Sequence, residues 1–239
     1  MRALFEMPFN VLYLITICCL VGAMWRRRRQ VAGSDRRTAA FILLAFLFLA
    51  LGDAAHVGFQ VLAFALNKTA EPVTVFGSNV FLVPLGGLAT AVTFTLFHGA
   101  MILAWAARYK KDIGIWGWAL FALAVIRCFI MMHPDNHWNK SFGGGPLYIY
   151  RNVPLMLMQL GLAALILRDS LATGDTLLRR IAILILVSFA CYAPVVFLYD
   201  RFPAVGMLMI PKTICYVTMG ILAFREFYIS PKTAPVSNV

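Results

Sequence analysis

The sequence predicts an all-α, polytopic membrane protein with seven transmembrane helices that form a single domain over residues 1–239. Two observations lead to this class. Hydrophobic residues make up 62% of the chain and charged residues only 13%, and the apolar residues fall in long runs. A run of about 17 to 25 apolar residues is enough for one helix to cross the hydrocarbon core. We expect the helices near residues 8–25, 39–66, 77–106, 113–132, 152–168, 180–199 and 203–224.

Charged residues separate the first four segments. The first run ends at the four arginines 26–29, and the second begins after Arg36 and Arg37. The third carries Gly86, Gly87 and three threonines, small residues that favour close packing between membrane helices. The fourth follows the charged stretch 108–112 and ends before the polar sequence HPDNHW.

The last three segments are bounded in the same way. The fifth follows a loop with three glycines, and the sixth begins at Arg179 and Arg180. The seventh begins at Pro203 and ends at Arg225. Pro194 in the sixth segment and Pro211 in the seventh each remove one backbone hydrogen bond and are expected to open their helices locally.

The basic residues predict the orientation. Most of the 21 lie beside the first, third and fifth connections and the tail, and Lys and Arg near helix ends are retained on the cytoplasmic side. We therefore expect the N-terminus outside, the C-terminus in the cytoplasm, and a multi-pass protein of the cell inner membrane. The net charge of +11 is assigned to contacts with anionic lipid headgroups, and nucleic acid is excluded as a partner.

Asp53 lies at the centre of the second predicted span and Lys212 lies inside the seventh. A charged group at bilayer depth costs about 3 kcal/mol or more, so such residues usually face a bundle interior and indicate a ligand, ion or proton site. We predict that both lie toward the floor of one site. His56 follows Asp53 by one turn, and this pair is the predicted catalytic group of a lipid hydrolase.

Further polar residues fall at a similar depth in the outer half of five helices. This coincidence predicts an outward-opening polar cavity, although interhelical hydrogen bonds are the alternative explanation for any one of these residues. The predicted ligand-binding residues are Lys212, Arg127, Gln60, Asn152, Gln159, Tyr192, Tyr216, Arg151, His133, Asp135 and His137. No metal site is predicted, because only H-P-D-N-H has tight ligand spacing and it lies in a loop that contains proline.

The segments LGDAAH, HPDNHW, YRNVP and PVVFLYDRFPAVGMLMIPKT resemble signatures of a bacterial family of uncharacterised seven-span membrane proteins. This resemblance implies the seven-helix fold and no particular activity. A second, partial resemblance is to lysoplasmalogenases, membrane enzymes that cleave the vinyl-ether bond of lysoplasmalogens. It rests on Gly52–Asp53 and on Phe94 four residues before His98. Those enzymes have more spans and a second acidic residue, for which Asp200 is a loose match here.

Three functional classes remain open. We expect a pocket for a small amphiphilic or anionic, lipid-like ligand, with hydrolysis of that ligand by Asp53 and His56 as one version. A receptor or sensor with Lys212 as the anchor for a ligand or for retinal is the second class. A proton-coupled transporter is the third, although no internal repeat is evident. Membrane lipids are expected partners; a homo-oligomer, a signalling partner and the identity of any cofactor are left open.

Overall fold

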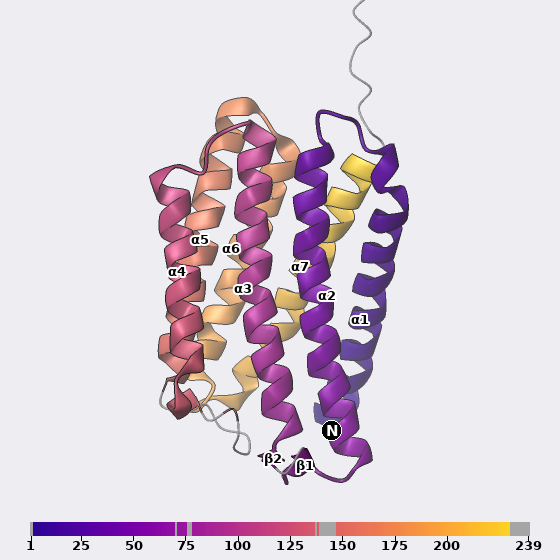
Figure 1. Ribbon diagram of the computed structural model, residues 1–239, viewed down its shortest axis with the longest axis vertical. Helices are drawn as coiled ribbons and strands as arrows, with labels where there is room; N and C mark the ends of the chain where they lie inside the picture. Colours follow the sequence, from indigo (N-terminus) through magenta and orange to yellow (C-terminus); the bar gives the residue numbers. More distant parts are fainter. Residues whose placement is uncertain (1, 70, 76–77, 137, 139–146, 230–239) are drawn as a thin grey trace, which may run out of the picture.

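A computed structural model describes residues 2–69, 71–75, 78–136, 138 and 147–229. Helices make up 86% of the structure, which confirms the all-α class. Within the described residues, seven helices are long and apolar enough to cross a membrane, as the sequence predicted. They stand side by side in one bundle (Figure 1) and span α1 Arg2–Arg27, α2 Arg36–Ala65, α3 Leu82–Tyr109, α4 Gly114–Met132, α5 Tyr148–Thr173, α6 Thr176–Leu198 and α7 Met209–Phe224.

Successive helices run in opposite directions, so the bundle has two distinct ends (Figure 1). We call one the hairpin end; it holds β1 Val73–Val75, β2 Ser78–Val80 and the short helices η2 Pro134–Asn136 and η3 Pro203–Leu208. The other is the arginine-rich end, with η1 Arg28–Gln30 and the π-helical turn η4 Arg225–Ile229. The seven candidate spans indicate a multi-pass membrane protein.

Some helix ends differ from the expected ones. The third helix begins at Leu82 instead of near residue 77, because Ser78–Val80 pairs with Val73–Val75 as an antiparallel hairpin. The fifth helix begins at Tyr148 and continues to Thr173, beyond the expected 152–168 at both ends. The seventh segment starts at Pro203 as a 3-10 helix and becomes α-helical only at Met209.

The α2–α3 pair is held by close backbone contact at small residues. A Cβ atom added at Gly52 would clash with the Thr93 side chain, and one at Gly86 would lie 3.0 Å from the Cα of His56. Thr90 Oγ1 donates to the Gly52 carbonyl at 3.0 Å, so it links the two backbones directly. These contacts fix how α2 and α3 lie against each other, and with them the places of Asp53 and Phe94.

A network of ion pairs ties the helices together at the arginine-rich end. Arg108 of α3 lies 2.7 Å from Asp35, which precedes α2, and 2.7 Å from Asp175, which caps α6. Asp169 of α5 accepts a hydrogen bond from Trp105 Nε1 at 3.0 Å. Asp169 also forms ion pairs with Lys111 and Arg168. Asp35, Asp169 and Asp175 therefore each have a basic partner, and their ion pairs link α2, α3, α5 and α6.

A layer of apolar side chains fills the bundle between this network and its middle. Phe97, Met101, Leu162, Ile166 and Ile185 are all at most 1% exposed. They come from α3, α5 and α6, so the layer crosses the bundle. On these helices packed hydrocarbon lies between most polar groups of the hairpin half and the arginine-rich end, and His98 lies at its edge, against Phe97.

We predict that Gly52→Ala lowers the stability of the folded bundle while Gly58→Ala does not. A Cβ at Gly52 meets Thr93 and the α3 backbone, whereas one at Gly58 on the same helix has no atom within 4 Å. Overpacking of this kind costs about 1–3 kcal/mol. Thermal unfolding of both variants in detergent measures the difference, and equal midpoints would refute the close contact.

Candidate functional site

Lys212 lies in the first turn of α7, with its ammonium group among three aromatic rings. Nζ is 4.6 Å from the centroid of Phe94, 4.7 Å from that of Tyr192 and 5.7 Å from that of Tyr216. We call these three rings the aromatic cage. Within the described residues, Lys212 has no hydrogen bond and no ion pair within 4.0 Å. Cation–π contacts offset part of its desolvation cost, but rings do not replace the oxygen acceptors that three N–H groups require.

Asp53 lies near the same depth but has a different direct partner. Its Oδ2 accepts a hydrogen bond from the Tyr13 hydroxyl of α1 at 2.6 Å. Asp53 is 12 residues before the end of α2, which places it about 18 Å from the hairpin end. Lys212 lies about 17 Å from Pro203, measured along η3 and α7 from the same end. The two charges interact electrostatically, although they form no direct ion pair.

His56 does not contact Asp53 through a hydrogen bond. Its Nε2 lies 3.0 Å from the amide nitrogen of Gln60, one turn further along α2. Its Nδ1 is buried and has no hydrogen-bond partner within the described part of the chain. The predicted Asp53–His56 pair is thus present on one helix, but each member bonds to another residue.

Tyr192 and Asn152 form the side of the cage that faces α5. The Tyr192 hydroxyl donates to Asn152 Oδ1 at 2.9 Å, and Asn152 Nδ2 donates to the Tyr148 carbonyl at 2.9 Å. Asn152 is 4% exposed, so both hydrogen bonds of its amide are buried. These bonds hold the Tyr192 ring against Lys212.

Gln159, Tyr216 and Ser188 form a second buried group under the cage. Gln159 Nε2 donates to the Tyr216 hydroxyl at 3.0 Å, and Ser188 Oγ donates to the same oxygen at 3.1 Å. Gln159 and Ser188 are 0% exposed and Tyr216 is 2% exposed. Tyr216 therefore belongs both to the cage and to this inner group.

Arg127 is a buried cation whose partners are neutral. Its Nε donates to the Arg151 carbonyl at 3.0 Å, and Nη1 donates to the Ala91 carbonyl at 2.7 Å and to Thr95 Oγ1. At 2% exposed, it joins α4 to α3 and α5. These bonds hold the three helices together at Arg127, and its predicted ligand contact stays a prediction.

The remaining predicted residues lie at the hairpin end. Arg151 donates to Asn136 Oδ1 at 3.0 Å and lies over the rings of Trp138 and Tyr148. His133 and Asp135 are exposed and face each other, with Nδ1 and Oδ2 3.6 Å apart. His137 lies outside the described residues. This cluster lies at the hairpin end of α4 and α5, and within the described residues it forms no hydrogen bond or ion pair with Lys212.

Two residues of the site were not predicted. Tyr13 was missed because α1 was not assigned to the cavity, although a phenol in an apolar span needs a hydrogen-bond partner, and that requirement was the available signal. Phe94 was noted only for its spacing to His98. Nothing in the sequence identifies it as a wall of the cage, since that contact joins α3 to α7.

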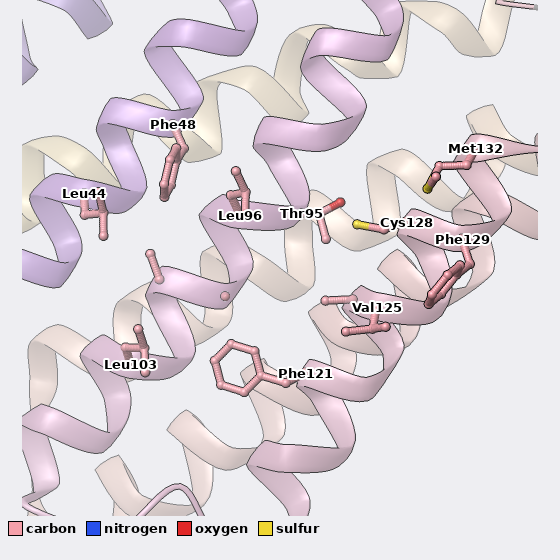
Figure 2. Close-up of a pocket in the computed structure, with 13 residues that line it drawn as sticks. Leu44, Phe48, Thr95, Leu96, Leu103, Phe121, Val125, Cys128, Phe129 and Met132 are labelled. Atoms are coloured by element: carbon pink, nitrogen blue, oxygen red, sulfur yellow. The ribbon is translucent and has the colours of Figure 1, made fainter.

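An open apolar groove of about 510 Å³ lies elsewhere, between α3 and α4 with α2 at its side (Figure 2). Phe121, Val125 and Phe129 line one wall, and Leu96 and Leu103 line the other. It contains none of the predicted ligand-binding residues. In a bilayer this groove faces hydrocarbon.

Within the part of the chain that the structure describes, no group of three or more His, Cys, Asp or Glu side chains is placed to hold a metal ion. No protein-family model, curated protein or solved structure matches the chain. The candidate site is accordingly defined by its own geometry.

We predict that Tyr13→Phe destabilises the protein by about 1–3 kcal/mol, because Asp53 then lacks its hydrogen-bond donor at bilayer depth. Tyr150→Phe is the matched control, since Tyr150 is 65% exposed. Thermal unfolding of the purified variants measures the effect. A Tyr13→Phe midpoint equal to that of wild type would show that Asp53 does not depend on this bond.

Proposed function

We propose that the protein binds a small anionic amphiphile from the membrane, with the anionic head at Lys212. One observation carries the proposal: the Lys212 ammonium lies at bilayer depth in an aromatic cage, without a hydrogen bond or close ion pair in the described residues. A carboxylate or phosphate oxygen supplies the acceptors that this group lacks. Charge-assisted hydrogen bonds of this kind are short and strong.

The charge balance inside the hairpin half supports an anion. Arg127 and Lys212 are two interior cations, and Asp53 is one interior carboxylate. Arg127 bonds to backbone carbonyls and a hydroxyl, so it is neutralised by no acid within the described residues. Arg151 is half-buried, as Lys212 is, and also has no acidic partner in the described residues. Uncompensated charge at low dielectric is costly, so a ligand anion would reduce this excess of positive charge.

The surroundings support an amphiphile over a simple ion. Lys212 follows a 3-10 helix at the hairpin end, and the helices around it expose large apolar side chains such as Phe202 and Met207. A hydrocarbon tail fits this apolar surface while the head reaches the lysine. A free inorganic anion would have to give up its hydration with no apolar contact in return.

The apolar layer beneath the site favours binding over transport. Phe97, Met101, Leu162 and Ile166 separate the polar groups from the arginine-rich end. A carrier would need a path for its ligand through this layer. Binding needs no path through this layer.

Hydrolysis by Asp53 and His56 has less geometric support than binding. Asp53 accepts from Tyr13, and His56 contacts Gln60, so they do not form a hydrogen-bonded acid–base pair. The residues behind the likeness to lysoplasmalogenases, Asp53 and Phe94, nevertheless lie on the facing helices α2 and α3. We propose binding as the function and hydrolysis as a further step to be tested on the bound amphiphile.

The proposed location is the inner membrane of the cell, with the hairpin end outside. The connections at the arginine-rich end carry most of the basic residues, among them Arg26–Arg29, Arg36 and Arg37. Such residues are retained on the cytoplasmic side. The ligand then enters from the outer leaflet.

We predict that Lys212→Met weakens binding of dodecyl phosphate by about 10- to 100-fold, which corresponds to loss of a charged hydrogen bond. Titration calorimetry on protein in phosphatidylcholine nanodiscs measures this affinity. Dodecanol, which has the same tail and no charge, should bind both forms weakly and equally.

Lys68→Met is the matched control for charge. Lys68 is exposed at the hairpin end, pairs with Glu71 and lowers the pKa of that carboxyl through its hydrogen bond and its charge. Its loss should leave dodecyl phosphate affinity unchanged. If Lys212→Met unfolds like wild type and binds dodecyl phosphate equally well, Lys212 is not the anchor.

A covalent ligand is the second candidate, because an aromatic cage and a nearby carboxylate would also suit an imine between Lys212 and retinal. The anion proposal predicts that added retinal produces no shifted visible absorption band. A band that disappears with hydroxylamine and is absent from Lys212→Met would contradict the anion proposal and show that Lys212 forms an imine with the aldehyde.

A further inference from the structure

A second, deeper polar site lies beneath the aromatic cage, where two buried acceptor atoms have no partner. His98 Nε2 and Gln159 Oε1 are both buried and make no hydrogen bond within the described residues. Both side chains are 0% exposed. An unpaired buried polar atom costs about 1–3 kcal/mol, so two in one place call for an occupant.

The state of His98 follows from its other ring nitrogen. Nδ1 lies 2.8 Å from the Phe94 carbonyl, which can only accept, so Nδ1 carries the proton. Nε2 of the neutral ring is then an acceptor. The free atom of His98 therefore needs a donor.

His98 faces the helix that carries Gln159. It is seven residues before Trp105 on α3 and so lies on the same helix face, and Trp105 bonds to Asp169 of α5. Gln159 lies on α5, ten residues before Asp169. The helices α3 and α5 run in the same direction. His98 precedes Trp105 by seven residues and Gln159 precedes Asp169 by ten, so His98 and Gln159 lie at similar heights along the α3–α5 interface.

Tyr216 connects the two. The rings of His98 and Tyr216 both pack edge-on against Phe94, at 4.7 Å and 5.2 Å between centroids, and both pack in the same way against Phe97. The Tyr216 oxygen accepts from Gln159 and Ser188, so its own proton has no acceptor within the described residues. The hydrogen bond between the Ser188 and Tyr216 hydroxyls can also run from Tyr216 to Ser188. In either direction one of the two hydroxyl protons has no acceptor within the described residues.

The groups without a partner are thus one hydroxyl proton, of Tyr216 or Ser188, and two acceptors, His98 Nε2 and Gln159 Oε1. A reversed Gln159 amide would change its free atom to a donor, and the cluster would still need a partner that both donates and accepts. A single O–H group does both. We propose that His98, Gln159 and Tyr216 form an inner site that binds an O–H group directly beneath Lys212.

This inference rests on the proposed function for one of its two sources. The O–H group belongs either to a hydroxyl next to the anionic head of the amphiphile or to an internal water molecule. Either source can accept from the spare hydroxyl proton and donate to His98 Nε2; a hydroxyl has only this one donor, whereas water can also donate to Gln159 Oε1.

The first test reads His98 without any added ligand. Solid-state NMR of protein with isotope-labelled histidine, in phosphatidylcholine bilayers, gives the ring-nitrogen shifts. The signal of His98 among the four histidines is assigned by its loss in His98→Phe. We expect Nε2 to have the shift of a hydrogen-bonded acceptor. A shift typical of a free acceptor, or a protonated Nε2, overturns the inner site whatever Lys212 binds.

The second test separates the two sources with a matched pair of probes, dodecanoate and 2-hydroxydodecanoate. A head-group hydroxyl predicts roughly 3- to 10-fold tighter binding of the hydroxylated probe, the range for one neutral hydrogen bond. This preference should vanish in His98→Phe and persist in His133→Phe, which alters an exposed histidine. Equal binding together with a hydrogen-bonded Nε2 assigns the site to water. A preference that persists in His98→Phe would overturn the assignment of the hydroxyl to this site.

Discussion

A lysine ammonium held among aromatic rings between the helices is the constraint on which the arrangement of this protein depends. Three helices supply the rings: Phe94 from α3, Tyr192 from α6 and Tyr216 from α7 itself. Each ring is held by further contacts, such as the bond from Tyr192 to Asn152. The cage stabilises a cation but offers no oxygen to it, and this unmet requirement points to a ligand.

The rest of the bundle divides into a polar half and a sealed half. At the arginine-rich end the acids Asp35, Asp169 and Asp175 are all paired, and a packed apolar layer lies above them. In the hairpin half several polar atoms remain without partners. Three of the four buried side-chain atoms without a partner in the described residues, His56 Nδ1, His98 Nε2 and Gln159 Oε1, lie in or next to this half, and the fourth is the Tyr109 hydroxyl at the arginine-rich end.

Hydropathy predicted the seven helices because each must bury its backbone bonds within one long apolar segment. The β1–β2 hairpin escaped prediction, since three-residue strands show no usable periodicity. The depth of Asp53 and Lys212 was predictable from residue counts along each helix. Their partners were not: Tyr13 and Phe94 reach the site through contacts between helices, and helix spacing says nothing about which helices are neighbours. For the same reason the sequence could not show that Arg127 bonds to backbone carbonyls of α3 and α5.

The most direct measurement is an experimental structure of the protein purified with its native lipids, at a resolution that places oxygen atoms around Lys212. We expect density for an anionic head group with an oxygen within hydrogen-bonding distance of Nζ, while Asp53 keeps its bond to Tyr13. A Lys212 ammonium bonded directly to the Asp53 carboxylate, with no density between the aromatic rings and the hairpin end, would contradict this expectation.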